Sequence, residues 1–315
     1  MIDFFNKIYS SINNKKPFPV KYNALLLKAL RITANIVLPI YFRLSANNPN
    51  YALKKNTQSD KPKVIVSLTS IPIRINRLWL AVETILRQTH KPDKIILWLS
   101  NEQFPDIKQL PKRLLDLCKR GLEIELKDND LKSHKKYYYA IKEYPHDILI
   151  TIDDDILYPS NMIKNLIDAH NIYPNSVIAR YGRRIKVDPE GIMPYNEWEM
   201  HYITEIPDTF AFFGSGGGTL FPLYSLPSIT KDKEVFMKIC PLADDVWLNS
   251  MIRLNNRYVY MLEANKEVFL PIINFNNVTL ASKNLDENLN DRQINDVRYY
   301  LKEHCNIDPF RDVLV

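Results

Sequence analysis

Residues 148–152 limit the folds that this chain can adopt more than any other segment. Their sequence, Ile-Leu-Ile-Thr-Ile, is an uninterrupted apolar and β-branched run, which is the pattern of a strand buried in the centre of a parallel sheet. Asp153, Asp154 and Asp155 follow directly, and Pro159, which cannot continue a central strand, comes soon after. The sequence therefore predicts a buried strand that carries three carboxylates at its carboxyl end.

The position of these carboxylates indicates a ligand site. Open α/β sheets bind their ligands at the carboxyl ends of the strands. Three adjacent negative charges repel one another unless a positive group lies among them. Hard divalent cations such as Mn²⁺ or Mg²⁺, brought in with a phosphate-bearing substrate, meet that need. The alternative is a solvated acidic turn, and the partners described below favour the ligand site.

Strands and helices are expected to alternate around this segment. The expected strands span 64–69, 94–99, 122–126 and 148–152, and the expected helices between them span 78–88, 110–120 and 130–144. Beyond the carboxylates we expect a helix at 161–170, a strand at 176–181, an irregular segment at 182–212, a strand at 257–262 and a helix at 289–304. Such alternation means parallel strands joined by right-handed crossovers. The predicted fold class is therefore α/β, with a Rossmann-like, mostly parallel central sheet flanked by helices.

Two later segments also have the composition of functional sites. Four of the chain's seven glycines lie in 213–219, Phe-Gly-Ser-Gly-Gly-Gly-Thr. In a chain with so few glycines, we expect glycine where the backbone passes close to a ligand or another part of the chain, or where it adopts a positive φ. Asp244 and Asp245 begin a predicted helix. Capping and the helix dipole favour acids there, but a cap needs only one, so the pair predicts a second acidic site.

The N-terminal 60 residues differ from the rest in charge. They hold nine Lys and Arg against two acids, which leaves 33 basic and 34 acidic residues in the remaining 255. A neutral body argues against a nucleic-acid-binding protein, which would need a basic face. Lys28, Arg31 and Pro39 interrupt the apolar segment 24–42, so we expect no transmembrane helix, which needs roughly 20 apolar residues. Two interpretations stay open: contact of residues 1–45 with an anionic membrane surface, or a helix packed on the body.

Composition and cysteine usage limit the classes to which this protein can belong. Hydrophobic content of 46% and charged content of 25% are globular values. Cys118, Cys240 and Cys305 are far apart and form no metal-binding or disulfide pattern. We therefore expect a cytoplasmic protein in a reducing compartment, peripheral on the inner face of the cytoplasmic membrane if its N-terminal segment binds lipid. Residues 47–61, rich in Asn, Ser and Lys, are expected to form a linker.

The order of these features resembles the GT-A glycosyltransferases, particularly the family-2-like bacterial enzymes that build surface polysaccharides. The features are a first strand followed by Thr-Ser-Ile-Pro-Ile-Arg (69–74), a basic helix start, Asp-Asp-Asp, Gly-Ser-Gly-Gly-Gly and Ala-Asp-Asp. They cover roughly residues 62–265. The resemblance implies a GT-A-like catalytic domain at 61–315 after an N-terminal helical appendage and linker at 1–60. Within it the nucleotide-binding part spans 61–160, the acceptor and catalytic part 161–275 and the C-terminal helix 289–304.

By that resemblance the chain transfers a sugar from a nucleotide-diphosphate donor, expected to be a UDP-sugar, to a glycan or lipid-linked acceptor. The implied donor-binding residues are Thr69, Ser70, Arg74, Lys132, Lys135, Lys136, Asp153 and Asp154. Asp155 and Asp153 would hold Mn²⁺ or Mg²⁺. Gly216, Gly217 and Gly218 would approach the sugar or acceptor, and the aromatic-rich irregular segment would supply Trp198 to the acceptor pocket. Asp244 and Asp245 form the catalytic pair, with Asp245 as the base, and a base opposite the leaving group predicts inversion at the anomeric carbon.

The sequence departs from that family in two ways and leaves two alternatives. A long segment with Pro222, Pro227 and Pro241 separates the glycines from the acidic pair, and no histidine lies between His201 and His304 to serve as a late metal ligand. One alternative is a phosphohydrolase of the HAD type, with an aspartate nucleophile in the triplet and a lysine such as Lys142. In that class the acidic motif normally ends the first strand, whereas three strand–helix units precede it here. The other alternative is a non-catalytic carbohydrate-binding protein, which two intact acidic sites disfavour.

Overall fold

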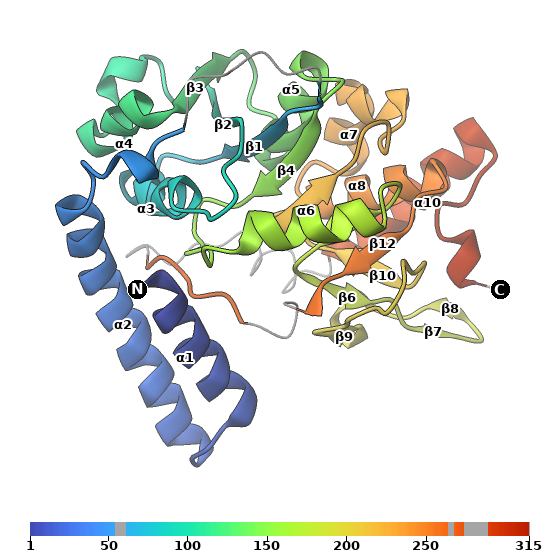
Figure 1. Ribbon diagram of the computed structural model, residues 1–315. Helices are drawn as coiled ribbons and strands as arrows, with labels where there is room; N and C mark the ends of the chain where they lie inside the picture. Colours follow the sequence, from blue (N-terminus) through green and yellow to red (C-terminus); the bar gives the residue numbers. More distant parts are fainter. Residues whose placement is uncertain (54–60, 264–267, 274–288, 315) are drawn as a thin grey trace.

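The computed structural model describes residues 1–53, 61–263, 268–273 and 289–314, and Figure 1 shows its arrangement. Within these residues a seven-stranded sheet runs through the molecule in the order β12-β5-β11-β4-β1-β2-β3. Its strands are β1 (Val64–Thr69), β2 (Lys94–Ser100), β3 (Leu122–Lys127), β4 (Ile148–Ile152), β5 (Val177–Ala179), β11 (Gly217–Phe221) and β12 (Val259–Met261). The predicted α/β class is confirmed, and β4 lies at the centre of the sheet.

The sheet is mixed because β11 runs antiparallel to both of its neighbours, β4 and β5. Strands β1, β2, β3 and β4 pair in parallel, as expected from the alternating helices. The register of β11 against β4 shifts between Gly217 and Thr219, and Gly218 has a φ of +94°. Such a bulge favours glycine. The strand was not expected from the sequence because glycine is normally depleted in strands.

Helices cover both faces of the sheet, and each face has its own core. One core contains side chains of α3 (Ile75–Leu86), α4 (Lys112–Asp116) and α6 (Met162–Ile172). The other contains side chains of α5 (Lys135–Glu143), α7 (Lys233–Ile239), α8 (Asp244–Leu254) and α10 (Leu289–Cys305). Alternate residues of β1 serve the two sides, with Val66 in the first core and Ile65 in the second, as a strand buried on both faces requires.

Several element bounds differ from those expected. The helix expected at 110–120 is the short α4 followed by a 3₁₀ turn (Leu117–Arg120), which Gly121 ends with a φ of +111°. The helix expected at 130–144 begins with a 3₁₀ turn (Lys132–His134) and becomes α5 only at Lys135. The segment expected to be irregular contains short strands, β6 (Gly182–Arg184), β7 (Val187–Asp188), β8 (Gly191–Ile192), β9 (Glu199–Met200) and β10 (Ala211–Phe213). Strands of two or three residues are too short for sequence periodicity to reveal them.

At the N-terminus α1 (Ile2–Lys15) and α2 (Val20–Leu44) form a helical hairpin, called here the N-terminal hairpin. Side chains of both helices join the first core, among them Phe5, Leu38 and Phe42. Packing against the body, one of the two interpretations left open, is therefore present. Despite Pro39, α2 runs unbroken, and it is long and apolar enough to cross a membrane by length and composition. The expected linker contains a 3₁₀ turn at Pro49–Tyr51, and its residues 54–60 lie outside the described residues, as does the expected boundary at 275.

Candidate active site

A cavity of about 520 Å³ lies where the carboxyl end of β4 meets the N-terminus of α8. Ten of the residues proposed from the sequence line it: Thr69, Ser70, Arg74, Lys132, Lys136, Asp153, Asp154, Asp155, Asp244 and Asp245. They come from segments that are far apart in the sequence. The fold therefore places the acidic triplet and the acidic pair in one cavity.

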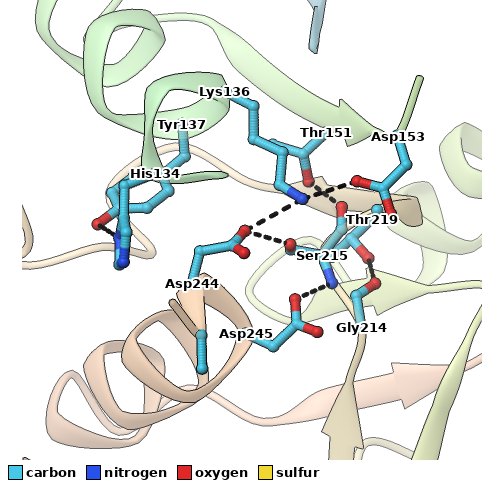
Figure 2. Close-up of polar contacts among 12 residues, drawn as sticks. His134, Lys136, Tyr137, Thr151, Asp153, Gly214, Ser215, Thr219, Asp244 and Asp245 are labelled. Atoms are coloured by element: carbon cyan, nitrogen blue, oxygen red, sulfur yellow. Dashed lines mark hydrogen bonds and ion pairs between the residues drawn. The ribbon is translucent and has the colours of Figure 1, made fainter. Parts of the chain in front are cut away.

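Lys136, at the start of α5, joins the two acidic groups (Figure 2). Its Nζ lies 2.9 Å from Oδ1 of Asp153 and 3.1 Å from Oδ2 of Asp244. The side chain is buried, which opposes its charge, but the two nearby carboxylates raise the pKa of Lys136 well above its ordinary value. Lys136 is therefore a fixed positive charge in the floor of the cavity.

The two acids of α8 have opposite pKa shifts although they are adjacent. Burial raises the pKa of Asp245 to about 6, and the neighbouring charge of Asp244 adds to the effect. Burial also opposes ionisation of Asp244, but the charge of Lys136 outweighs it and holds the pKa of Asp244 at about 2. Neighbouring acids with separated pKa values are the usual arrangement when one acts in proton transfer and the other stays ionised.

Ser215 holds both of these acids in place, as Figure 2 shows. Its backbone N–H donates to Oδ1 of Asp245 at 2.7 Å, and its hydroxyl donates to Oδ2 of Asp244 at 2.6 Å. The backbone around Ser215 is fixed in turn by hydroxyl groups of the sheet: Thr151 donates to Ser215 O at 2.6 Å, and Thr219 donates to Gly214 O at 2.9 Å. Ser215 was not singled out from the sequence, although its place inside the glycine segment was the available signal.

Arg74 and Ser70 bind the acidic triplet on its other side. Arg74 Nη1 lies 2.8 Å from Oδ1 of Asp154 and 3.0 Å from Oδ2 of Asp155, and the Ser70 hydroxyl donates to Asp154. Asp154 is buried and is held by both Arg74 and Ser70. Burial raises the pKa of Asp155 to about 7, and the charges of Asp153 and Asp154 add to the effect. The three carboxylates of the triplet pair with two cations, Arg74 and Lys136, and Lys136 is shared with Asp244.

This excess of negative charge fits a divalent cation. The side chains of Asp153 and Asp155 are 43% and 30% exposed, so their oxygens are accessible from the cavity. Within the described part of the chain, no group of three or more His, Cys, Asp or Glu side chains is arranged to hold a metal. Two carboxylates suffice for Mg²⁺ or Mn²⁺ when a phosphate-bearing substrate and water supply the other oxygens. Asp153 and Asp155 are the residues that fit this role.

The three glycines lie beside the acids or in the sheet. A Cβ on Gly216 would lie 1.8 Å from Oδ2 of Asp153, so only glycine leaves room for that carboxylate. Gly217 lies against Tyr181 and Gly218 against Met162. None of the three lines the cavity. The glycines thus do not reach the cavity: Gly216 makes room for Asp153, and the other two belong to β11.

Two further predicted residues do not line the cavity. Lys135 is fully buried and pairs with Asp130. Trp198 is buried, its indole Nε1 donates to Met193 O at 2.8 Å, and its ring packs on Phe212 with centroids 5.1 Å apart. Trp198 therefore packs within the aromatic segment and not in the cavity, contrary to the prediction from the sequence.

Four further residues line the cavity, three of them in that segment and one, Tyr181, directly before it. They are Tyr181, Arg183, Tyr195 and Phe212. Arg183 lies over the Tyr195 ring, with its guanidinium carbon 4.6 Å from the ring centroid, and donates to Tyr195 O at 3.2 Å. An aromatic-rich segment was the correct signal for these residues, but the sequence did not distinguish the side chains that face the cavity from those that face the core.

No protein-family model matches this chain, and no curated protein matches it. Among solved structures, it is similar to a mannosyltransferase from Pyrobaculum calidifontis in complex with GDP-Man and Mn²⁺, with 12% identity and a TM-score of 0.41 over 76% of this chain and 65% of that one. It is also similar to a 4-diphosphocytidyl-2C-methyl-D-erythritol synthase from Anaerococcus prevotii DSM 20548, with 13% identity and a TM-score of 0.41 over 66% of this chain and 90% of that one. This chain thus spans less than two thirds of the mannosyltransferase. The similarity concerns the fold alone, and the activity has to be inferred from the site.

Proposed function

We propose that this chain is a metal-dependent glycosyltransferase. It moves a sugar from a nucleotide-diphosphate donor, a UDP-sugar, to a hydroxyl group of a glycan or lipid-linked acceptor in the synthesis of a surface polysaccharide. One observation carries the proposal: an acidic triplet with Arg74 and an acidic pair with a raised pKa at Asp245 face the same cavity, with Lys136 between them. Such a site can bind a diphosphate at one end and accept a proton at the other.

The donor side of the cavity provides positive charge for the diphosphate. Arg74 and Lys132 line this side, and the side chain of Lys132 is 47% exposed. An arginine recognises phosphate oxygens through several donors at once, and a lysine contributes a point charge. A divalent cation held by Asp153 and Asp155 would neutralise the charge that develops on the departing diphosphate. Thr69 and Ser70, at the end of β1, then lie beside the nucleoside.

The acceptor side provides the base. Ser215 N–H binds Oδ1 of Asp245, so Oδ2 is the oxygen available to an acceptor hydroxyl. As the hydroxyl oxygen bonds to the anomeric carbon, its proton passes to Asp245 and the bond from that carbon to the diphosphate oxygen breaks with its electron pair. One such displacement inverts the anomeric centre. General-base assistance of this kind typically accelerates a reaction about 10²–10⁴-fold.

The proposal is tested by assaying the purified chain with a panel of nucleotide-sugars, with and without Mn²⁺. Asp245→Asn should lower transfer about 10²-fold or more while UDP and Mn²⁺ still raise the melting temperature. Asp155→Asn should abolish the Mn²⁺-dependent part of that rise. Asp168→Asn on α6, where the side chain is 55% exposed and pairs with Lys164, is the matched control and should behave as the wild type. Full activity in both site variants would refute the assignment.

The same assay separates the two alternatives. Hydrolysis of a simple phosphate ester without any nucleotide-sugar would favour a phosphohydrolase. Lys142, the lysine that the phosphohydrolase alternative would use, lies over the Tyr138 ring and does not line the cavity, which disfavours that activity. Saturable sugar binding with neither transfer nor donor hydrolysis in the presence of Mn²⁺ would favour a carbohydrate-binding protein.

A further inference from the structure

The N-terminal hairpin exposes an unusual amount of apolar surface. On α2 the side chains of Leu25, Ile32, Ile36, Ile40 and Leu44 are 63%, 42%, 58%, 51% and 84% exposed. Their spacing of four to seven residues places them on one side of the helix, and we call them the outer stripe. Near the hairpin turn Phe18, Val20 and Tyr22 are also exposed. Contiguous exposed apolar surface of this kind marks an interaction site.

The body fixes the orientation of this stripe. Ala34, Leu38 and Phe42 of α2 are buried in the first core. Asn35, on the same inner side, donates to Pro271 O at 2.9 Å and accepts from the N–H of Ile273 at 2.9 Å. Figure 1 shows the hairpin beside the body, with the turn between its helices pointing away from the sheet. The outer stripe therefore faces away from the protein.

The charge of the hairpin indicates what covers this surface. Residues 1–53 contain seven Lys and Arg and a single acid, Asp3. Asp3 accepts hydrogen bonds from the N–H and hydroxyl of Ser160, so it belongs to the contact with the body. Lys15, Lys16, Lys21 and Lys28 are exposed around the hairpin turn and the first half of α2. We infer that the N-terminal hairpin docks on an anionic lipid bilayer, with the outer stripe among the acyl chains and these lysines at the headgroups.

The hairpin docks as a peripheral element and does not span the bilayer. In the most apolar 18-residue stretch of α2, only 28% is buried. The buried part includes Asn35, which is hydrogen-bonded to the body. A spanning helix would have to break these contacts and bring Asn23 and Asn35, both now buried, into hydrocarbon. A helix lying in the interface keeps its inner side on the protein. Anionic lipid of this kind is characteristic of the cytoplasmic leaflet.

The hairpin is also fastened to the segment behind the acidic triplet. Asn6 of α1 donates to Leu157 O at 3.1 Å. Pro271, which Asn35 binds, forms an isolated β-bridge with Ile156 and is followed by Ile272, whose N–H donates to Asp155 O at 2.7 Å. Docking therefore holds the cavity at a fixed position relative to the lipid surface. This position favours a lipid-linked acceptor, a conclusion that rests on the proposed transferase function.

The test is flotation of the purified full chain with vesicles of phosphatidylcholine alone or mixed with phosphatidylglycerol. The wild type should float with the mixed vesicles and be released by high salt. Ile32→Ser/Ile36→Ser/Ile40→Ser should lower vesicle affinity about tenfold or more without lowering the melting temperature, because all three side chains are exposed. Lys21→Gln/Lys28→Gln should lower binding to the mixed vesicles.

The matched control replaces three apolar residues of the body that are more exposed than the three replaced in the outer stripe, Ile172→Ser/Ile206→Ser/Tyr224→Ser, which are 69%, 68% and 67% exposed. It should bind vesicles as the wild type does. Equal flotation of the outer-stripe variant and the control, or no flotation of the wild type, would overturn the inference. So would a lipid-free wild type that is a dimer while the outer-stripe variant is a monomer, because a second copy would then cover the stripe. The assay contains neither donor nor metal, so its result is independent of the transferase proposal.

Discussion

Asp245 shows how neighbouring residues in one helix turn acquire different chemistry. Its carboxylate is partly buried beside Asp244, and burial and the neighbouring charge together raise its pKa to about 6. Asp244 faces Lys136 and the Ser215 hydroxyl, and stays ionised. A base with a pKa just below neutral pH is deprotonated under working conditions and still holds a proton well in the transition state.

A pH dependence of transfer follows from this pKa. The base must be ionised, so kcat/KM should fall as the pH drops through about 6 and level off above it. The measurement is a pH–rate profile at saturating Mn²⁺. The residual rate of Asp245→Asn should lack this acidic limb between pH 5 and pH 7. An unchanged limb in that variant would assign the limb to another group.

Gly216 tests whether the position of a single carboxylate matters. In Gly216→Ala the new Cβ would lie 1.8 Å from Oδ2 of Asp153, so that carboxylate must move. Mn²⁺-dependent UDP binding, measured by calorimetry, should weaken about tenfold or more. Gly191→Ala is the control: it has a φ of +132° with no atom within 4 Å of the new Cβ, so it should cost about 1 kcal/mol of stability and leave binding unchanged.

At the scale of elements, α5 joins the two halves of the site. Its first turn places Lys136 between β4 and α8, against Asp153 and Asp244. Both carboxylates pair with the ammonium group of Lys136. Without that group, each would be an uncompensated charge in a partly buried site. The packing of α5 on β1 and β4 is thus a condition for the acidic pair to ionise.

Lys136→Met measures this dependence. The variant should lose about 3 kcal/mol of stability near neutral pH, because Asp244 then has no cationic partner. Asp244 has a depressed pKa, so this contribution is present above the unfolded pKa of about 3.9 and is lost as the pH falls toward 2. Urea unfolding at several pH values should therefore show the difference from the wild type shrinking in acid. Lys142→Met, an exposed position on the same helix, is the control and should change stability little.

Elements with strong periodicity were predictable, and those defined by tertiary contacts were not. The strand at 148–152 was predicted with its bounds, because five consecutive apolar and β-branched residues allow few other structures. β11 was missed because its glycines, Gly217 and Gly218, oppose strand formation locally and are required by the closeness of Tyr181 and Met162. Most of the acids and cations that line the cavity were named from the sequence, and their roles stay predictions. Ser215 and Arg183 were not named, because their roles depend on which way a side chain points.

For the molecule as a whole, stability depends on a neutral histidine in the second core. His134 is fully buried and stacks on Phe236 with centroids 4.4 Å apart. Its Nε2–H donates to Cys240 O at 2.8 Å, so Nδ1 accepts from the Tyr137 hydroxyl at 2.8 Å. This neutral tautomer connects α5, α7 and the segment before α8. Burial lowers the pKa of His134 to about 4.

Global stability should therefore decline in mild acid. The unfolded chain binds a proton at His134 near pH 6.5 and the folded chain only near pH 4, so stability falls as the pH drops through that window. By pH 5 the loss from this group should be about 2 kcal/mol. Urea unfolding at pH 7 and pH 5 measures it. His134→Gln should be less stable at pH 7 but should lose less than the wild type on going to pH 5; an equal loss would contradict this role.

The antiparallel strand β11 also determines when the pairing of β4 can be completed. One edge of β4 pairs with β1, which precedes it in the chain. The other edge pairs with residues 217–221, and α6, β5 and the strands of the two small sheets lie between β4 and these residues in the sequence. Pairing across such a separation is slow and leaves an apolar edge open in the meantime. A nascent chain that has reached only residue 210 thus exposes the β4 edge and still lacks Ser215, Asp244 and Asp245. Assembly of the site and the closing of the sheet are one late event in folding.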